Sequence, residues 1–221
     1  MHSEPNIASY SLGEVIANSI THGLGLILAI IGLVVISVSA VRYGDAWHIV
    51  SGAIFASTLV LLYAVSTLYH SIPHPRAKQI LQLLDHSAIF LLIAGSYTPF
   101  TLVSLNGAWG WSLFGVVWGL AVLGIVLKWS AWRRYEWLAL SLYLLMGWVV
   151  IFAFEPLVTA VDPGGLWLLF FGGIAYTGGI AFYLWESLPF NHAVWHLFVI
   201  AGSTFHFFAV LFYVIPAPPG V

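Results

Sequence analysis

Cysteine is absent from the 221-residue sequence, and charged residues make up only 6% of it. Without cysteine there are no disulfides, thiolate nucleophiles or cysteine-based metal sites, so any metal must be held by histidine and carboxylate. A soluble domain carries about 25% charged residues, so this chain is too poor in charge to cover its own surface in water. The formal net charge of −2 also gives no electrostatic footprint for nucleic acid.

Apolar residues dominate the chain: 61% of it is hydrophobic and 16% is aromatic. Long apolar runs are separated by short polar or Gly/Pro breaks, and each run is long enough to cross a bilayer as a helix. Transmembrane strands would alternate apolar and polar residues, which these runs do not. We therefore predict an all-α integral membrane protein, a seven-transmembrane helix bundle with spans at roughly 16–41, 47–71, 79–103, 110–128, 136–155, 164–185 and 192–215.

Basic residues predict the orientation, because cytoplasmic connections collect Lys and Arg. If the N-terminus is cytoplasmic, only Arg42 falls outside, and the basic residues in cytoplasmic connections are Arg76, Lys78, Lys128, Arg133 and Arg134. We therefore predict a short cytoplasmic N-terminal segment over 1–15, the seven-helix domain over 16–215 and an external C-terminal tail over 216–221. The expected location is the cell membrane, as a multi-pass protein.

Several polar side chains lie inside the predicted spans, where such groups are costly and are candidates for function. Ser66 and His70 fall in the last cytoplasmic turns of the second span, and Asp85 lies near the cytoplasmic start of the third. His192 and His196 open the seventh span from the same side. Residues four apart share a helix face. The topology thus predicts three imidazoles and a carboxylate at one depth, on three helices.

Three histidines with one open position form the ligand set of a catalytic zinc site, in which water takes the fourth place. Zinc can lower the pKa of that water to about 7. We therefore predict a Zn²⁺ site with His70, His192 and His196 as ligands. Asp85 is the predicted general base or water-holding partner, and Ser66 is predicted to orient a ligand, the water or a substrate carbonyl. The alternative is that these histidines form hydrogen bonds between helices without a metal.

Other polar residues in the spans have less specific roles. Glu14, Asn18 and His22 form a stripe at four-residue spacing, for which capping or packing is favoured and a place beside the site is the alternative. His206 lies ten residues beyond His196, about 15 Å along the helix, so we expect it to form a hydrogen bond between helices.

Proline and glycine predict local features of two spans. Pro99 predicts a kink in the third span. Gly172-Gly173 and Gly178-Gly179 predict close contact between the sixth span and a neighbouring helix. His86, next to Asp85, receives no predicted role.

The polar residues occur in motifs that together resemble the haemolysin III family. The motifs are EVIANSITHGLG at 14–25, STLYH at 66–70, LDHS at 84–87, GSYTP at 95–99 and HAVWH at 192–196. This family is the bacterial branch of the progestin and adipoQ receptor (PAQR) superfamily, which is grouped with alkaline ceramidases. The resemblance covers essentially the whole chain, and it is the combination and order of the motifs that make it specific.

The resemblance implies a seven-helix fold with a cytoplasmic N-terminus and a zinc ion near the cytoplasmic face. The implied ligands are His70, His192 and His196, with Asp85 as the site carboxylate and Ser66 as the motif serine. Because superfamily relatives are similar to hydrolases that cleave the amide of ceramide, the implied function is zinc-dependent hydrolysis of a lipid amide. A bacterial inner membrane is the implied location.

Two other functions stay open at this point. One is a non-enzymatic receptor or membrane sensor in which the zinc is structural. The other is a membrane-lytic or channel-type haemolysin, although a channel would need polar residues from one face to the other, and here they crowd one end.

Overall fold

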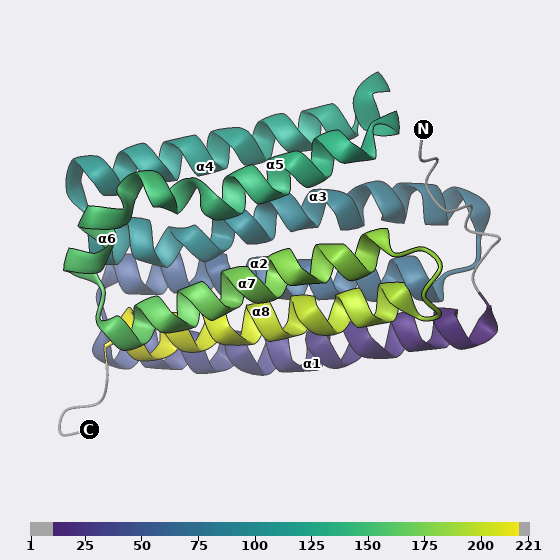
Figure 1. Ribbon diagram of the computed structural model, residues 1–221. Coiled ribbons are helices and arrows are strands. Elements are labelled where there is room, and N and C mark those ends of the chain that lie inside the picture. The colour runs from purple at the N-terminus through teal and green to yellow at the C-terminus, as the bar shows by residue number, and fades with distance from the viewer. Residues whose placement is uncertain (1–10, 217–221) are drawn as a thin grey trace.

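Seven helical spans run side by side in the computed structural model, which describes residues 11–216 (Figure 1). The first four spans are α1 (Leu12–Tyr43), α2 (Ala46–Ser71), α3 (Pro75–Pro99) continued by the π-helix η2 (Phe100–Leu105), and α4 (Gly107–Lys128). The other three are α5 (Glu136–Trp148) continued by the 3₁₀-helix η4 (Val149–Ala153) and α6 (Phe154–Ala160), then α7 (Pro163–Leu184) and α8 (Asn191–Tyr213). A 3₁₀ turn, η3 (Ala131–Arg134), joins α4 to α5. The predicted all-α class and the number of spans are confirmed.

Helix starts follow the capping residues of the sequence. Ser11 and Glu14 form a capping box, so α1 begins at Leu12, one turn before the predicted start. The Asp45 side chain accepts from the backbone N–H groups of Trp47 and His48 at the start of α2. Of the predicted terminal segments, 1–10 and 217–221 lie outside the described residues.

Pro99 changes the helix type of the third span. The α-helix ends at this residue, and the span continues as a π-helix to Leu105. Proline has no N–H to donate to the preceding turn, and its ring crowds the carbonyl four residues back, so the regular α-helical pattern is interrupted at this position.

Two packed groups of helices make up the bundle. One buried cluster lies mainly on α1, α2 and α8, and the other joins α3, α4 and α5. The α7 helix lies along α8, and the close approach uses glycine as predicted: a Cβ at Gly172 would overlap His206, and one at Gly179 would overlap Phe198. Large apolar side chains cover the outside of the bundle, as expected of a surface that faces lipid.

The start of α1 and the end of α8 lie at opposite ends of the bundle (Figure 1), as an odd number of spans requires. The ends of α2 and α4 and the starts of α3, α5 and α8 therefore share the end where α1 begins. The cytoplasmic assignment of this end stays a prediction.

Because the chain has no cysteine, single-cysteine labelling tests this orientation without background. Ala131, in η3, and Ala160, at the end of α6, are both exposed and lie at opposite ends of the bundle. We expect a membrane-impermeant maleimide to label Ala160→Cys in intact cells and Ala131→Cys only after permeabilisation. The reverse pattern would invert the orientation.

Two glycines of α4 provide a matched test of the packing. A Cβ at Gly124 would overlap the fully buried Phe90 ring, whereas nothing lies within 4 Å of a Cβ at Gly119. We expect Gly124→Ala to destabilise the protein by about 1–3 kcal/mol through overpacking. Gly119→Ala should be neutral or slightly stabilising, since alanine favours a helix. Thermal unfolding followed by intrinsic tryptophan fluorescence measures both, and equal midpoints would contradict this packing.

Candidate metal centre

Three histidines from two helices converge near the end of the bundle where α1 begins. His70 lies in the last turn of α2, and His192 and His196 lie in the first turns of α8. One nitrogen from each imidazole can be chosen so that all three lie within 4.8 Å of one another. Ring centroids are 5.0 Å apart for His70 and either partner, and 4.6 Å apart for His192 and His196. The predicted meeting of distant parts of the chain therefore occurs.

The donor set fits a metal ion such as zinc. A tetrahedral zinc with Zn–N bonds of about 2.0–2.1 Å sets its nitrogens roughly 3.4 Å apart, so small rotations of the rings would bring them onto one ion. The Nε2 atom of His70 is buried and has no hydrogen-bond partner among the described residues. An orphaned buried acceptor of this kind is costly, and a metal ion would satisfy it.

A neighbouring threonine fixes which nitrogen of His196 is available. The Thr21 hydroxyl lies 2.9 Å from His196 Nδ1, and it donates its own proton to the carbonyl of Ala17 at 2.8 Å. With the Thr21 proton on this carbonyl or on that of Asn18 at 3.0 Å, His196 Nδ1 is the protonated nitrogen that donates to Thr21, and Nε2 is the unprotonated ligand atom. Ligand imidazoles in zinc sites are commonly held in this way by a hydrogen bond on the other nitrogen. Sequence reasoning had not singled out Thr21.

Asp85 and Ser66 lie beside the histidines but are linked to each other. Both side chains are buried, at 7% and 0% exposure, and Ser66 makes a side-chain hydrogen bond with Asp85. The Ser66 hydroxyl also lies 2.6 Å from His22 Nδ1. An ionised carboxylate only accepts, so with Asp85 ionised the proton donors run from His22 to Ser66 and from Ser66 to Asp85. The serine therefore connects a histidine of α1 to the carboxylate of α3.

The three polar residues of the α1 stripe, Glu14, Asn18 and His22, do not all have the same role. Glu14 caps the helix and accepts from the backbone N–H of Phe190 at 3.2 Å, just before α8 begins. His22, for which packing had been the favoured role, is instead part of the site: its ring stacks on His196, with centroids 3.4 Å apart and planes 14° from parallel. Asn18 is 1% exposed, and its amide atoms have no partner among the described residues. The four-residue spacing of the stripe was the signal for His22, but it did not say which helix the stripe faces.

His86 and His206 are the other two histidines of the cavity wall. His86 lines the same cavity as Asp85, and its backbone carbonyl accepts from the Tyr143 hydroxyl at 2.8 Å. His206 makes the predicted contact between helices, with Nε2 3.4 Å from the carbonyl of Leu169 on α7.

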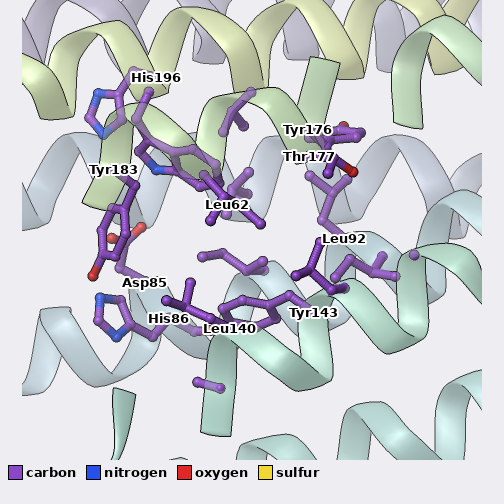
Figure 2. Close-up of a pocket in the computed structure, with 18 of the residues that line it drawn as sticks. Leu62, Asp85, His86, Leu92, Leu140, Tyr143, Tyr176, Thr177, Tyr183 and His196 are labelled. Carbon is purple, nitrogen blue, oxygen red and sulfur yellow. The ribbon is translucent and has the colours of Figure 1, made fainter. Parts of the chain in front are cut away.

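An elongated, mostly apolar cavity extends from the histidines into the bundle. Asp85, His86, Tyr183 and His196 gather at one end in Figure 2, and Leu92, Tyr176 and Thr177 lie toward the other. The walls come mainly from α3, α5, α7 and α8, with apolar side chains such as Ile89, Leu92, Leu140, Leu144, Ile180 and Val199. Farther along, the Trp148 indole N–H donates to Thr177 at 3.1 Å and ties α5 to α7. Few polar groups in an apolar pocket are typical of a site for an apolar ligand.

Together, the fold and the site define a multi-pass helical membrane protein with a buried group of three histidines that could bind a metal ion. The family model described as "Haemolysin-III related" matches residues 11–207. The chain belongs to this family, which agrees with the resemblance seen in its motifs.

Named relatives align over nearly the whole chain. "Hemolysin-3 homolog" of Bacillus subtilis (strain 168) is 49% identical over 95% of this chain and 98% of its own length. "Hemolysin-3" of Bacillus cereus is 48% identical over 92% of this chain and 93% of its own length. The human "Monocyte to macrophage differentiation factor" is 28% identical over 91% and 85% of the two lengths.

We expect the purified wild-type protein to carry one zinc ion per chain and His192→Ala to carry none, because two imidazoles cannot replace the set of three. His206→Ala serves as the control, since residue 206 lies about 15 Å along α8 from His196 and is too distant to join the ligands. Elemental analysis of monodisperse protein measures all three. Undiminished zinc in His192→Ala would mean that the ion binds elsewhere.

Proposed function

We propose that this protein is a zinc-dependent hydrolase of lipid amides, with its metal site near the cytoplasmic face of the cell membrane. The number of protein ligands is the observation that carries the proposal. Within residues 11–216, the group of mutually close ligand atoms contains three histidines and no carboxylate. Structural zinc sites are closed by four protein ligands, whereas catalytic sites keep one position open.

A zinc ion held by His70, His192 and His196 would supply Lewis acidity to an amide carbonyl and to water in the open position. Asp85, on α3, lines the same cavity as these histidines and is hydrogen-bonded to Ser66. Its carboxylate would accept a proton from the water and pass it to the nitrogen of the leaving amine. General acid–base catalysis of this kind contributes about 10²–10⁴-fold to a rate.

Ser66 and His22 would hold Asp85 in place for this proton transfer. The serine hydroxyl donates to the carboxylate, and His22 supports the serine through its 2.6 Å hydrogen bond. His22 also packs flat against His196. It therefore contacts both Ser66, which holds the Asp85 carboxylate, and one of the proposed zinc ligands. Preorganised contacts of this kind around a zinc site are typically worth 10–100-fold in activity or metal affinity.

The apolar cavity supports a lipid as the substrate. It begins at the histidines and continues between helices α3, α5, α7 and α8, and most of the surface of its wall is apolar. An acyl chain would lie there with its amide at the metal. With the cytoplasmic end assigned from the Lys and Arg residues, the site would lie within reach of lipids of the inner leaflet.

A structural zinc in a non-enzymatic receptor is the second candidate, and the ligand number argues against it. If Asp85 were a direct ligand, the site would be closed and this candidate would gain. The lytic role that the names of the Hemolysin-3 relatives indicate has no counterpart in the candidate metal group, whose three histidines gather at one end of the bundle.

Asp85→Asn separates these candidates, because it keeps the size of the side chain and removes the base. We expect the variant to retain its zinc and to lose fatty-acid release from ceramide by about 10²–10⁴-fold. Fatty acid is measured by mass spectrometry after incubation with the purified protein in mixed micelles.

Asp45→Asn is the matched control, since Asp45 is exposed and caps α2 at the opposite end of the bundle. It should leave the rate unchanged. If the wild type releases no fatty acid from ceramide or related N-acyl amides while zinc is bound, the hydrolase proposal is wrong.

A further inference from the structure

One imidazole of the cavity wall lies far from the proposed metal site. His206, on α8, lines the same cavity as His196. Ten residues separate the two along one helix, which corresponds to about 15 Å. Nothing in the proposed hydrolysis uses this imidazole.

The hydrogen bonding of His206 shows which of its nitrogens is available. Its Nε2 atom lies 3.4 Å from the carbonyl of Leu169. A carbonyl only accepts, so Nε2 carries the proton and Nδ1 is an unprotonated acceptor. Nδ1 is buried and has no partner among the described residues.

The surroundings of the ring turn this acceptor away from α7. The Cδ2–Nε2 edge faces α7, where it occupies the space that a Cβ at Gly172 would take. Nδ1 lies on the opposite side of the ring, on a residue that lines the cavity. Glycine at 172 therefore lets the imidazole dock on α7 through one nitrogen, while the other nitrogen is buried without a partner among the described residues.

A buried acceptor is costly unless a donor meets it, and a saturated hydrocarbon chain offers none. A hydroxyl is the smallest chain substituent that can donate. An extended chain advances about 1.2 Å per bond, as the three backbone bonds of a residue span roughly 3.6 Å, so 15 Å corresponds to about 12 bonds.

We propose that the cavity is a binding site for a long acyl chain with a hydroxyl near its middle, about ten to fourteen carbons from the carbonyl, and that His206 Nδ1 accepts a hydrogen bond from this hydroxyl. The inference rests on the proposed function in one respect: the carbonyl end of the chain lies at His70, His192 and His196. His206 is then a specificity-determining residue of the lipid site.

Competition binding on the full-length protein in detergent tests the proposal with three probes that displace a fluorescent fatty acid: stearic acid, 3-hydroxystearic acid and 12-hydroxystearic acid. The two hydroxy acids have the same composition and differ only in the position of the hydroxyl. We expect the 12-hydroxy acid to bind roughly 3- to 10-fold more tightly than the 3-hydroxy acid, as one hydrogen bond allows.

Three variants identify the acceptor. His206→Phe keeps a flat ring without the nitrogen and should bring the two hydroxy acids to equal affinity. His206→Asn retains an acceptor close to the Nδ1 position and should preserve the preference. Thr204→Val is the control, because Thr204 is exposed on the same helix and bonds only its own backbone at Ile200.

The outcomes separate the two proposals. If stearic acid binds but the two hydroxy acids bind with equal affinity, the role of His206 is wrong. It is also wrong if the preference for the 12-hydroxy acid survives His206→Phe. Either result leaves the hydrolase proposal intact, and an ordered water would then satisfy Nδ1. Failure of all three acids to bind overturns both the hydroxyl subsite and the acyl-chain cavity.

Discussion

Burial of polar side chains at membrane depth is the constraint on which the rest of the structure depends. Each imidazole or carboxylate inside a bundle of apolar helices loses its contacts with water, and it must find another partner or remain costly. In this chain most of those partners are on other helices. Thr21 on α1 holds His196 on α8, and His22 on α1 holds Ser66 on α2, which in turn meets Asp85 on α3. His70 Nε2 has no such partner within the described residues, and a metal ion would supply it.

Different helices supply the polar site and the apolar cavity. The α1, α2, α3 and α8 helices carry the clustered histidines, Ser66 and Asp85 at the end of the bundle where α1 begins. The α5 and α7 helices complete an apolar cavity that begins at those side chains, so the same fold can present reactive groups and shelter a hydrocarbon chain. Glycines on α7 allow the close contact with α8 that sets the His206 imidazole in the wall.

Most of the fold could be predicted from the sequence, because the length and hydropathy of a membrane span are properties of a continuous segment. The three metal-ligand candidates were also within reach, since their depth follows from the topology. That these side chains contact one another could not be predicted, because the spacing of residues along a helix does not say which neighbouring helix each face packs against. For the same reason His22 was assigned to packing in the first instance, and Thr21 was missed: a threonine that bonds its own helix gives no sign that it also contacts a ring on α8. Pro99 was expected to kink its helix, and the sequence pattern did not predict the π-helix that follows it over Phe100–Leu105.

The claim that everything else requires is that three imidazoles hold one zinc ion and leave a position open. X-ray absorption at the zinc edge of the purified wild-type protein tests it most directly, because it reports the number and type of the nearest atoms. The account predicts three imidazole nitrogens at about 2.0–2.1 Å and a single oxygen from water. A first shell with fewer than three imidazoles, or one closed by a carboxylate of the protein, would contradict it.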